Sequence, residues 1–240
     1  MLALLLAKVA GVPNSNWLSG QNHALKHERN IFEKQLLLAE TIEILYWGCQ
    51  FHSFGILPIE NVRDLESNEL KMILEGNKLA FTNGCYLIYK LASQNYIKLS
   101  DHRVAQIMSK AVMDFIHGEI SEIKVKDELM NNNTDDLLEK WMQTSYLKSA
   151  SLIAAGCHAM LLLAEHNELT QEVSIKFGTN VALAWHVYDE LEQLKQLKDI
   201  SIDEPNFLLP NLLHLKQQNN CKVNLSSFKV SNLKQITNKC

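Results

Sequence analysis

Apolar residues recur at every third or fourth position along most of this 240-residue chain, and that spacing restricts the folds open to it. The run from His102 to Ile123 is the clearest case, because its apolar residues share one face of a helix. These residues are Val104, Ile107, Met108, Ala111, Val112, Phe115, Ile116, Ile120 and Ile123. No stretch of any length alternates between apolar and polar residues, and the chain has only four prolines. The sequence therefore predicts an all-α fold.

The composition bounds the size of this helical protein and the partners open to it. Hydrophobic residues make up 47% of the chain and charged residues 21%, which is typical of a soluble globular domain. We expect one helical domain over residues 1–216 and a polar, poorly ordered tail over residues 217–240. The net charge of -4 gives no broad basic surface, so bulk electrostatics do not favour a nucleic acid or an anionic membrane as a partner.

The five cysteines are widely spaced and form no Cys-x-x-Cys pair, so we expect reduced thiols in a non-secretory compartment. Cys49, Cys85 and Cys157 lie in apolar helical runs and are expected in the core. No stretch reaches the roughly twenty apolar residues that a transmembrane helix needs. The apolar start of the chain, residues 1–11, is interpreted as a core helix and not as a targeting segment.

The most informative stretch runs from Phe177 to Gln193, FGTNVALAWHVYDELEQ. Asp189 and Gln193 are four residues apart, which places them one turn apart on one face of a helix. The stretch resembles the second aspartate-rich motif of trans-polyprenyl diphosphate synthases, in which carboxylates hold magnesium ions bridged to a diphosphate. In the match, Asp189, Glu190 and Gln193 take the places of the three aspartates, so only one aspartate remains.

Other stretches resemble the same family in the same order along the chain. His52 fits the histidine of the first magnesium motif, but Ser53 and Phe54 follow it in place of carboxylates. The further matches are Gly76-Asn77-Lys78-Leu79-Ala80, Met113-Asp114-Phe115 before Gly118-Glu119, Lys148-Ser149-Ala150-Ser151-Leu152-Ile153 and Leu209-Pro210. The resemblance implies an all-α bundle of the trans-isoprenyl diphosphate synthase type. The matching stretches do not include the family's first helices, so we expect this chain to be a fragment, a short isoform or a diverged form.

The resemblance also indicates which residues could meet a diphosphate. The family's lysine at the position of Lys148 contacts a diphosphate, and Lys78 is a weaker candidate; a solvated lysine on a helix surface is the alternative for Lys148. Asp189 and Glu190 are left as remnants of a metal site, and we expect no catalytic residue and no metal site in this chain. Magnesium prefers several oxygen ligands in near-octahedral geometry, which these two residues alone do not supply.

These losses are similar to those of the family's non-catalytic branch, the accessory subunits of heteromeric decaprenyl diphosphate synthases. That resemblance implies a catalytic synthase subunit as the partner, with Mg2+ bound in that partner and no cofactor bound by this chain alone. It also implies synthesis of the polyprenyl side chain of ubiquinone, in mitochondria. Two alternatives stay open: an active short-chain prenyl diphosphate synthase with a degenerate site, and an all-helical protein that binds an unrelated partner.

The apolar helices also predict an interface. Lys78–Leu91, Val104–Ile123 and Leu147–Ala164 carry apolar residues around much of their circumference. We expect Val104–Ile123 to pack against the catalytic subunit, with Met108 and Val112 at the contact. Packing within the chain's own core is the alternative.

Overall fold

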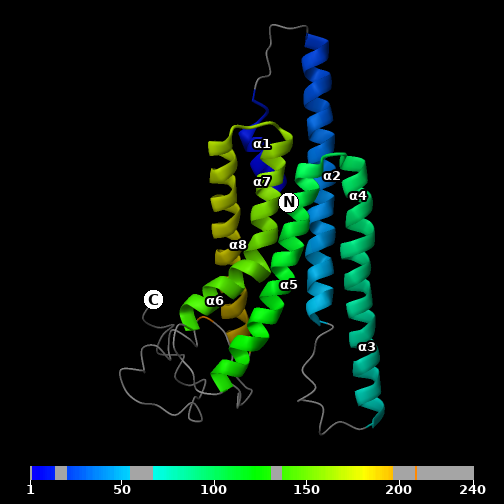
Figure 1. The fold of residues 1–240 in the computed structure, drawn as a ribbon, viewed down its shortest axis with the longest axis vertical. Helices are drawn as coiled ribbons and strands as arrows, with labels where there is room; N and C mark the ends of the chain where they lie inside the picture. Colours follow the sequence, from blue (N-terminus) through cyan, green and yellow to red (C-terminus); the bar gives the residue numbers. More distant parts are fainter. Residues whose placement is uncertain (1, 14–20, 55–66, 131–136, 197–208, 210–240) are drawn as a thin grey trace. The chain divides into compact units, whose positions relative to one another are not determined.

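The structure is a computed structural model that describes residues 2–13, 21–54, 67–130, 137–196 and 209. The regular secondary structure of these residues is helical, which confirms the predicted all-α class. The elements are α1 (Leu2–Ala10), α2 (Gln21–Phe54), α3 (Ser67–Cys85), η2 (Tyr86–Leu91), α4 (Ala92–Leu99), α5 (His102–Met130), α6 (Leu137–Ser145), η3 (Tyr146–Ala150), α7 (Ser151–Leu163) and α8 (Glu168–Gln196) (Figure 1). The two η elements are short π-helical segments that continue the α-helices on either side.

These helices form two compact units. Unit 1 comprises Met1–Phe115 and Ser151–Thr179, and unit 2 comprises Ile116–Ala150 and Asn180–Cys240. Helices α5 and α8 each contribute residues to both units. The tail expected over residues 217–240 lies outside the described residues, so the division of the chain into a domain and a tail stays a prediction.

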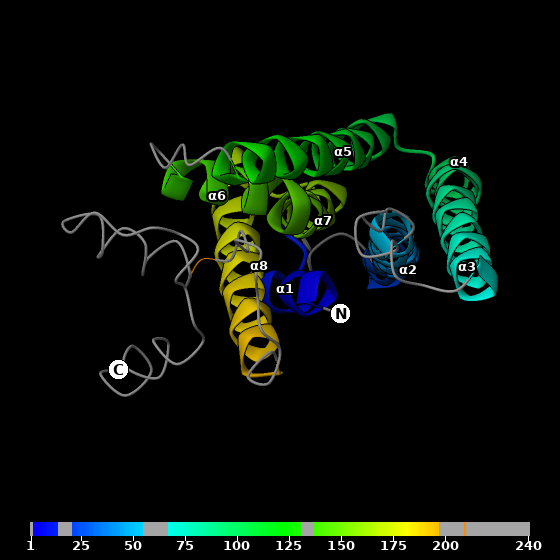
Figure 2. The ribbon, with the colours of Figure 1, turned by 90° about the horizontal axis from the view of Figure 1, so that it is seen from below.

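Unit 1 is built around α2. This helix packs against α3, η2 and α4, and also against α1 and α7. Figure 1 shows α3, η2 and α4 running antiparallel to α2, and Figure 2 shows α2 between them and α7. The α3–η2–α4 segment is therefore an edge of unit 1, with one side turned away from α2.

Helices α2 and α3 approach each other closely where Gly48 and Gly84 meet. A Cβ added at Gly84 would lie 2.7 Å from the backbone nitrogen of His52 and 2.8 Å from the carbonyl oxygen of Gly48. Backbone atoms on both sides leave no room for a side chain, so this crossing requires glycine. Helix packing therefore requires glycine at position 84.

The core of unit 1 contains side chains from α2, α4, α5 and α7. The largest fully buried apolar side chains are Leu38, Leu45, Leu99, Val104, Met108, Met160 and Leu161. Met108 is 0% exposed, so the prediction that it lies at a partner interface is wrong. The apolar face of α5 that carries Met108 covers the chain's own core, which was the alternative. The predicted core positions of Cys49 and Cys157 are confirmed, whereas Cys85 is half-buried; none of the three forms a disulfide.

Polar side chains fix the first turns of α5 and α8. The Asp101 carboxylate accepts hydrogen bonds from the backbone N–H groups of Arg103 (3.0 Å) and Val104 (3.4 Å). The hydrogen bonds that the Arg103 guanidinium donates to Asp101 hold the pKa of that carboxyl below its ordinary value. At the start of α8, the Asn167 side chain accepts a hydrogen bond from the backbone N–H of Thr170 (2.9 Å). Such caps satisfy N–H groups that the start of a helix leaves unpaired.

One helical run, Leu137–Leu163, is long and apolar enough to cross a membrane by length and composition. It joins α6, η3 and α7, and 56% of its most apolar part is buried inside the protein, as in the core helix of a globular protein. The run includes Glu139, Lys140 and Lys148, so it is not an uninterrupted stretch of about twenty apolar residues, and the sequence expectation stands. The predicted core helix at the start of the chain is confirmed as α1, whose Ala3 and Ala7 are buried.

Unit 2 has a small apolar core of its own. Val125, Leu137 and Trp141 form its buried cluster, and Val187 and Leu209 pack against that cluster. Trp141 belongs to α6 and Val187 to α8, so the cluster joins separate helices of the unit. Trp141 also donates a hydrogen bond to Glu190.

Candidate functional site

Glu190, a remnant of the second motif, lies in the interior of unit 2. It is only 3% exposed. Its Oε1 accepts a hydrogen bond from the indole Nε1 of Trp141 at 2.9 Å, and its Oε2 accepts one from the backbone N–H of Leu209 at 2.9 Å. The Nε2 of His186 lies 3.3 Å from the same Oε1. A buried carboxylate is tolerated when hydrogen bonds replace its lost water, and Glu190 has such partners on both oxygens.

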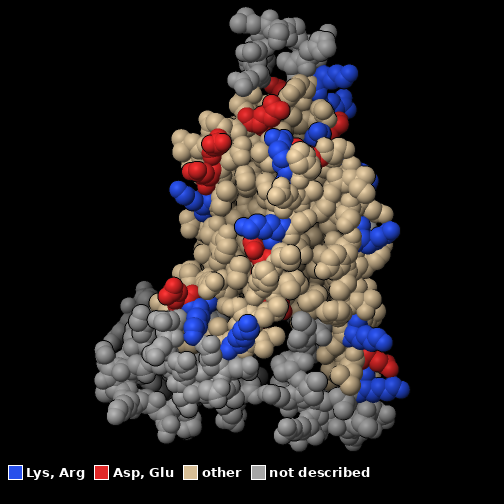
Figure 3. All heavy atoms as spheres, in the orientation of Figure 1, with Lys and Arg blue, Asp and Glu red and all other residues tan. Residues whose placement is uncertain are grey.

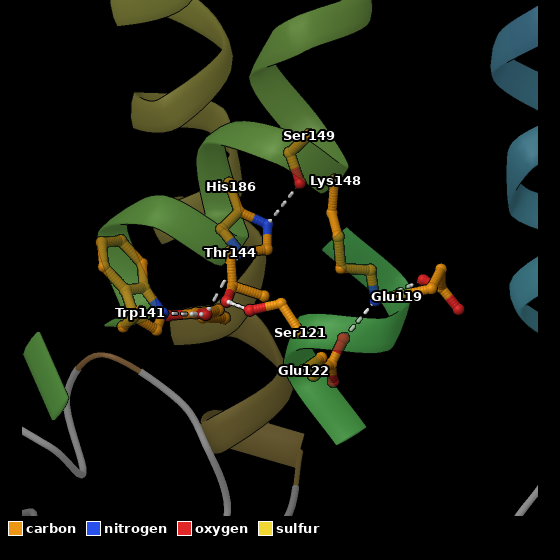
Figure 4. A network of polar contacts seen from close by, with 9 residues as sticks. Glu119, Ser121, Glu122, Trp141, Thr144, Lys148, Ser149 and His186 are labelled. Carbon is orange, nitrogen blue, oxygen red and sulfur yellow. Dashed lines mark hydrogen bonds and ion pairs between the residues drawn. The ribbon is translucent and has the colours of Figure 1, made fainter. Parts of the chain in front are cut away.

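His186 links Glu190 to η3. Its Nδ1 lies 3.1 Å from the hydroxyl oxygen of Ser149, and its ring stacks on Trp141 with centroids 6.0 Å apart and planes at 26° (Figure 4). Ser149, His186 and Glu190 thus form a chain of polar contacts. Ser149 lies inside a π-helical segment, where the backbone N–H groups are used by the helix and cannot form an oxyanion hole. The chain of contacts therefore does not have the geometry of a serine hydrolase.

Lys148, the residue expected to meet a diphosphate, is held by two carboxylates of α5. Its Nζ lies 2.6 Å from Oε1 of Glu119 and also pairs with Oε2 of Glu122 (Figure 4). The Lys148 side chain is 23% exposed, so it is not the solvated surface lysine of the alternative interpretation. Gly118 makes this contact possible, because a Cβ there would lie 2.6 Å from Cγ of Lys148 and 2.9 Å from its backbone nitrogen.

The electrostatics of Lys148 favour its charged form. Burial by itself lowers the pKa of Lys148, but attraction to Glu122 and Glu119 outweighs burial, and that pKa lies above its ordinary value. The lysine therefore stays protonated at neutral pH, with its charge already balanced by carboxylates of the same chain. A second anion at this amine would lie close to both carboxylates, and like charges repel.

The remaining site residues of the second motif and of α3 lie nearer to solvent. Asp189 is half-buried and Gln193 is exposed on α8, while Glu190 between them points inward. The predicted helical face shared by Asp189 and Gln193 is consistent with the observed helix. Lys78 is an exposed residue of α3, and its carbonyl oxygen accepts a hydrogen bond from Thr82 Oγ1 at 2.7 Å. The structure places Lys78 in unit 1 and Lys148 in unit 2.

The first motif position has an aromatic environment. His52 lies near the end of α2, with its ring 4.7 Å from that of Phe81 and 6.3 Å from that of Phe115, measured between centroids. Its Nδ1 is buried and has no hydrogen-bond partner among the described residues. Ser53 and Phe54 end the helix, and the loop that follows lies outside the described residues. Aromatic packing thus surrounds the retained histidine.

The fit of Mg2+ can be judged from these donors. Both oxygens of Glu190 accept hydrogen bonds from protein donors, which leaves fewer lone pairs for a metal ion. Within the described ranges, no group of three or more His, Cys, Asp or Glu side chains could hold a metal ion. The donors among the described residues therefore do not fit a magnesium site.

Two partners of these residues, Trp141 and Glu122, were not singled out by the sequence, and Glu119 was matched only as part of the Gly118-Glu119 pair. Glu119 and Glu122 are three residues apart and so share a helix face, a spacing that could have suggested a joint role. Their meeting with Lys148 depends on how α5 packs against η3, which the spacing does not encode. Trp141 lies in none of the stretches that match the family.

Comparison with known proteins places this chain. Residues 67–201, more than half of the chain, match the family described as polyprenyl synthetase. The chain belongs to this family. All trans-polyprenyl-diphosphate synthase PDSS2 of Mus musculus is 28% identical over 220 residues, which cover 89% of this chain and 52% of the mouse protein. A Neurospora crassa protein named probable hexaprenyl pyrophosphate synthase, mitochondrial, is 28% identical over 166 residues, which cover 68% of this chain and 36% of that protein.

The chain spans about half the length of the mammalian relatives that it matches. Two solved structures share its fold. A decaprenyl diphosphate synthase from Rhodobacter capsulatus matches with a TM-score of 0.62 at 15% identity, covering 99% of this chain and 70% of that one. A heptaprenyl diphosphate synthase from Staphylococcus aureus matches with a TM-score of 0.60 at 13% identity, covering 100% of this chain and 73% of that one. At these identities the two structures support the all-helical fold alone.

Proposed function

We propose that this chain is the accessory, non-catalytic subunit of a heteromeric polyprenyl diphosphate synthase. A catalytic partner subunit supplies the aspartates, the Mg2+ and the chemistry, and the complex makes the isoprenoid side chain of ubiquinone in mitochondria. Membership of the polyprenyl synthetase family supports a role in polyprenyl chain synthesis. Relatives from Neurospora crassa, Yarrowia lipolytica and Oryza sativa are named mitochondrial, which supports the proposed location.

One observation carries the non-catalytic part of the proposal: the chain's own groups engage both Lys148 and Glu190. Glu119 and Glu122 neutralise Lys148, and Trp141 and the backbone of Leu209 bind Glu190. Prenyl transfer requires cationic groups that stabilise a departing diphosphate, and each such group is worth roughly 10²–10³ in rate. A lysine and a carboxylate that are already paired contribute little to such a reaction.

The partner is proposed to cover the outer side of the α3–η2–α4 edge. Large apolar side chains are exposed there, and they comprise Met72, Leu79, Tyr86, Tyr89 and Ile97. Apolar surface of this extent on one helical edge is typical of a protein interface, with tyrosines among the residues enriched there. This edge replaces the Met108 face of α5 as the proposed contact with the catalytic subunit.

Reconstitution tests the proposed function. The purified chain is incubated with labelled isopentenyl and farnesyl diphosphates and Mg2+, alone and with a catalytic synthase subunit. We expect no product from the chain alone, and a long-chain product whose yield rises when both subunits are present. Turnover by the chain alone would favour an active short-chain synthase. A chain that neither turns over nor changes the partner's yield would favour an interaction protein with an unrelated partner.

The interface is tested with two matched substitutions. Leu79→Asp changes an exposed residue of α3, and Met113→Asp changes an equally exposed residue of α5; the two side chains are 62% and 60% exposed. We expect Leu79→Asp to abolish co-purification with the catalytic subunit, because a carboxylate in an apolar interface costs several kcal/mol, and Met113→Asp to retain it. Both variants should keep the wild-type helical content. Equal co-purification of the two variants would place the contact on another surface.

A further inference from the structure

Helix α2 carries a row of exposed side chains on one side, in addition to the residues that it buries in unit 1. The row comprises Phe32, Leu36, Glu40, Glu43, Trp47 and Phe51, all of them exposed. Successive members are three or four residues apart, so they share about 100° of the helix circumference and extend over roughly 28 Å. We call this row the α2 seam, because such spacing is typical of helices that pack side by side.

The two ends of the α2 seam are apolar and its centre is acidic. At the C-terminal end, the rings of Trp47 and Phe51 lie 6.4 Å apart between centroids. Glu40 and Glu43 form the centre, and α2 has no Lys or Arg beyond Lys34. On the face of the molecule seen in Figure 3, by contrast, Lys and Arg are mixed with Asp and Glu. The seam therefore presents two carboxylates between two apolar surfaces.

A second copy of this chain would fit the apolar ends of the α2 seam but not its centre. The order of apolar and acidic members is the same in either direction along the helix, so an antiparallel second α2 would set apolar ends opposite each other. The same pairing would set Glu40 of each copy opposite Glu43 of the other and bring four carboxylates together. Like charges placed opposite each other weaken an interface, so the centre favours a cationic partner over a second copy.

We propose that the α2 seam binds a basic amphipathic α-helix of another protein. Apolar residues of that helix cover the two ends of the seam, and Lys or Arg side chains between them meet Glu40 and Glu43. Charged residues are depleted at the centre of protein interfaces, so the two glutamates decide which helices bind, and the apolar ends supply most of the contact. The seam shares no residue with the α3–η2–α4 edge, so its partner is independent of the proposed catalytic subunit.

Two synthetic helical peptides, titrated into the full chain by calorimetry, test the charge of the partner. Both carry apolar residues at the spacing of the α2 seam, but one has Lys and the other has Glu at the two central positions. We expect the wild type to bind the Lys peptide at least about tenfold more tightly than the Glu peptide, because like charges repel. Glu40→Lys with Glu43→Lys should reverse this preference. Glu75→Lys with Glu172→Lys makes the same change of net charge at two exposed glutamates of other helices and should not reverse it.

Trp47→Asp tests the apolar part of the seam, and Trp185→Asp on α8 is the matched control, since the two side chains are 53% and 61% exposed. We expect Trp47→Asp to weaken binding of the Lys peptide by about tenfold or more, because a carboxylate is costly in an apolar contact, and Trp185→Asp to leave it unchanged. Both variants should keep the wild-type helical content measured by circular dichroism.

The comparison of the two peptides on the wild type needs no variant, so it decides the question if a variant does not fold. The proposal is overturned if the wild type binds neither peptide or binds both equally, or if either control has the effect of the seam variant that it matches. It is also overturned if sedimentation shows a dimer of this chain that Trp47→Asp dissociates, because a second copy then covers the α2 seam.

Discussion

His52 and Glu190 occupy the first and the second motif positions of the family, and they differ in the partners that surround them. His52 contacts the aromatic rings of Phe81 and Phe115, and its buried Nδ1 has no hydrogen-bond partner among the described residues. Glu190 is more deeply buried and carries a carboxylate, yet Trp141 and Leu209 donate hydrogen bonds to it. The Nδ1 of His52 thus has no hydrogen bond among the described residues, whereas both carboxylate oxygens of Glu190 accept one.

The two residues differ in whether their buried polar atoms are satisfied, and that difference decides what each contributes to stability. An unsatisfied buried polar atom costs free energy, so His52 adds nothing to stability through Nδ1. A buried carboxylate with donors on both oxygens holds those donors in place, so its loss leaves several groups unpaired. Lys148 follows the pattern of Glu190, because Glu119 and Glu122 surround its amine.

The largest expected effect is at Glu190. Glu190→Ala leaves the indole N–H of Trp141 and the backbone N–H of Leu209 without an acceptor in a buried site. We expect the free energy of unfolding to fall by roughly 2–4 kcal/mol. Urea denaturation followed by circular dichroism measures this fall. A loss below about 0.5 kcal/mol, the scale of a neutral surface change, would mean that the carboxylate is not used as the structure indicates.

Lys148→Met comes next. It removes the cation between Glu119 and Glu122 and leaves two carboxylates close together, so we expect a loss of roughly 1–3 kcal/mol. The triple variant that also carries Glu119→Gln and Glu122→Gln should recover part of this loss, since the repulsion is gone. If the stability change of the triple variant equals the sum of the changes of the three single variants, the three side chains do not act as a group.

The stability that Lys148 gains from Glu119 and Glu122 depends on pH, and the direction of that dependence follows from the pKa of Lys148. The pKa of Lys148 is higher in the folded chain than its ordinary value of 10.5, so folding favours the protonated amine. Its contribution to stability is complete below the unfolded pKa and is lost as the pH rises through the folded pKa. We expect the difference in free energy of unfolding between wild type and Lys148→Met to be constant from neutral pH to about pH 10 and to shrink above it. If this difference in free energy of unfolding shrinks only on acidification, in the pH range where carboxylates titrate, the pH dependence comes from the glutamates and not from Lys148.

A smaller effect of opposite sign is expected at His52. His52→Leu replaces a ring that carries an unpaired buried nitrogen with an apolar side chain of similar size beside Phe81 and Phe115. We expect the free energy of unfolding to stay the same or to rise by up to about 1 kcal/mol. Thermal unfolding checks the direction. A clear loss of stability would show that His52 has a polar role and would remove the contrast with Glu190.

The smallest effect is expected at Asp189. Asp189→Asn changes the one retained aspartate of the motif at a half-buried position, and we expect a change within about 0.5 kcal/mol. The yield of a reconstituted synthase should also stay at the wild-type level, because the proposed partner carries the chemistry. A loss of yield with unchanged stability would give Asp189 a part in the reaction and would contradict the non-catalytic proposal.

Much of the fold could be predicted from local sequence. The period of apolar residues gives helices such as α1 and α5, because burial of one face requires that spacing and no other. The interface prediction failed at Met108 for a related reason. A period shows that a helix has an apolar face, but the same face can cover the chain's own core or a partner.

The sequence by itself predicted the helical class, the resemblance to the family, and Lys148, Asp189 and Glu190 as candidate site residues, since each depends on residue types at short spacings. Only the tertiary structure decided what those remnants contact. Lys148 meets Glu119 and Glu122 because α5 approaches η3 at Gly118, and Glu190 meets Trp141 and Leu209 across 49 and 19 residues of sequence. A charged side chain is defined by its partners as much as by its type, and partners far apart in sequence are brought together by packing, which no local spacing encodes.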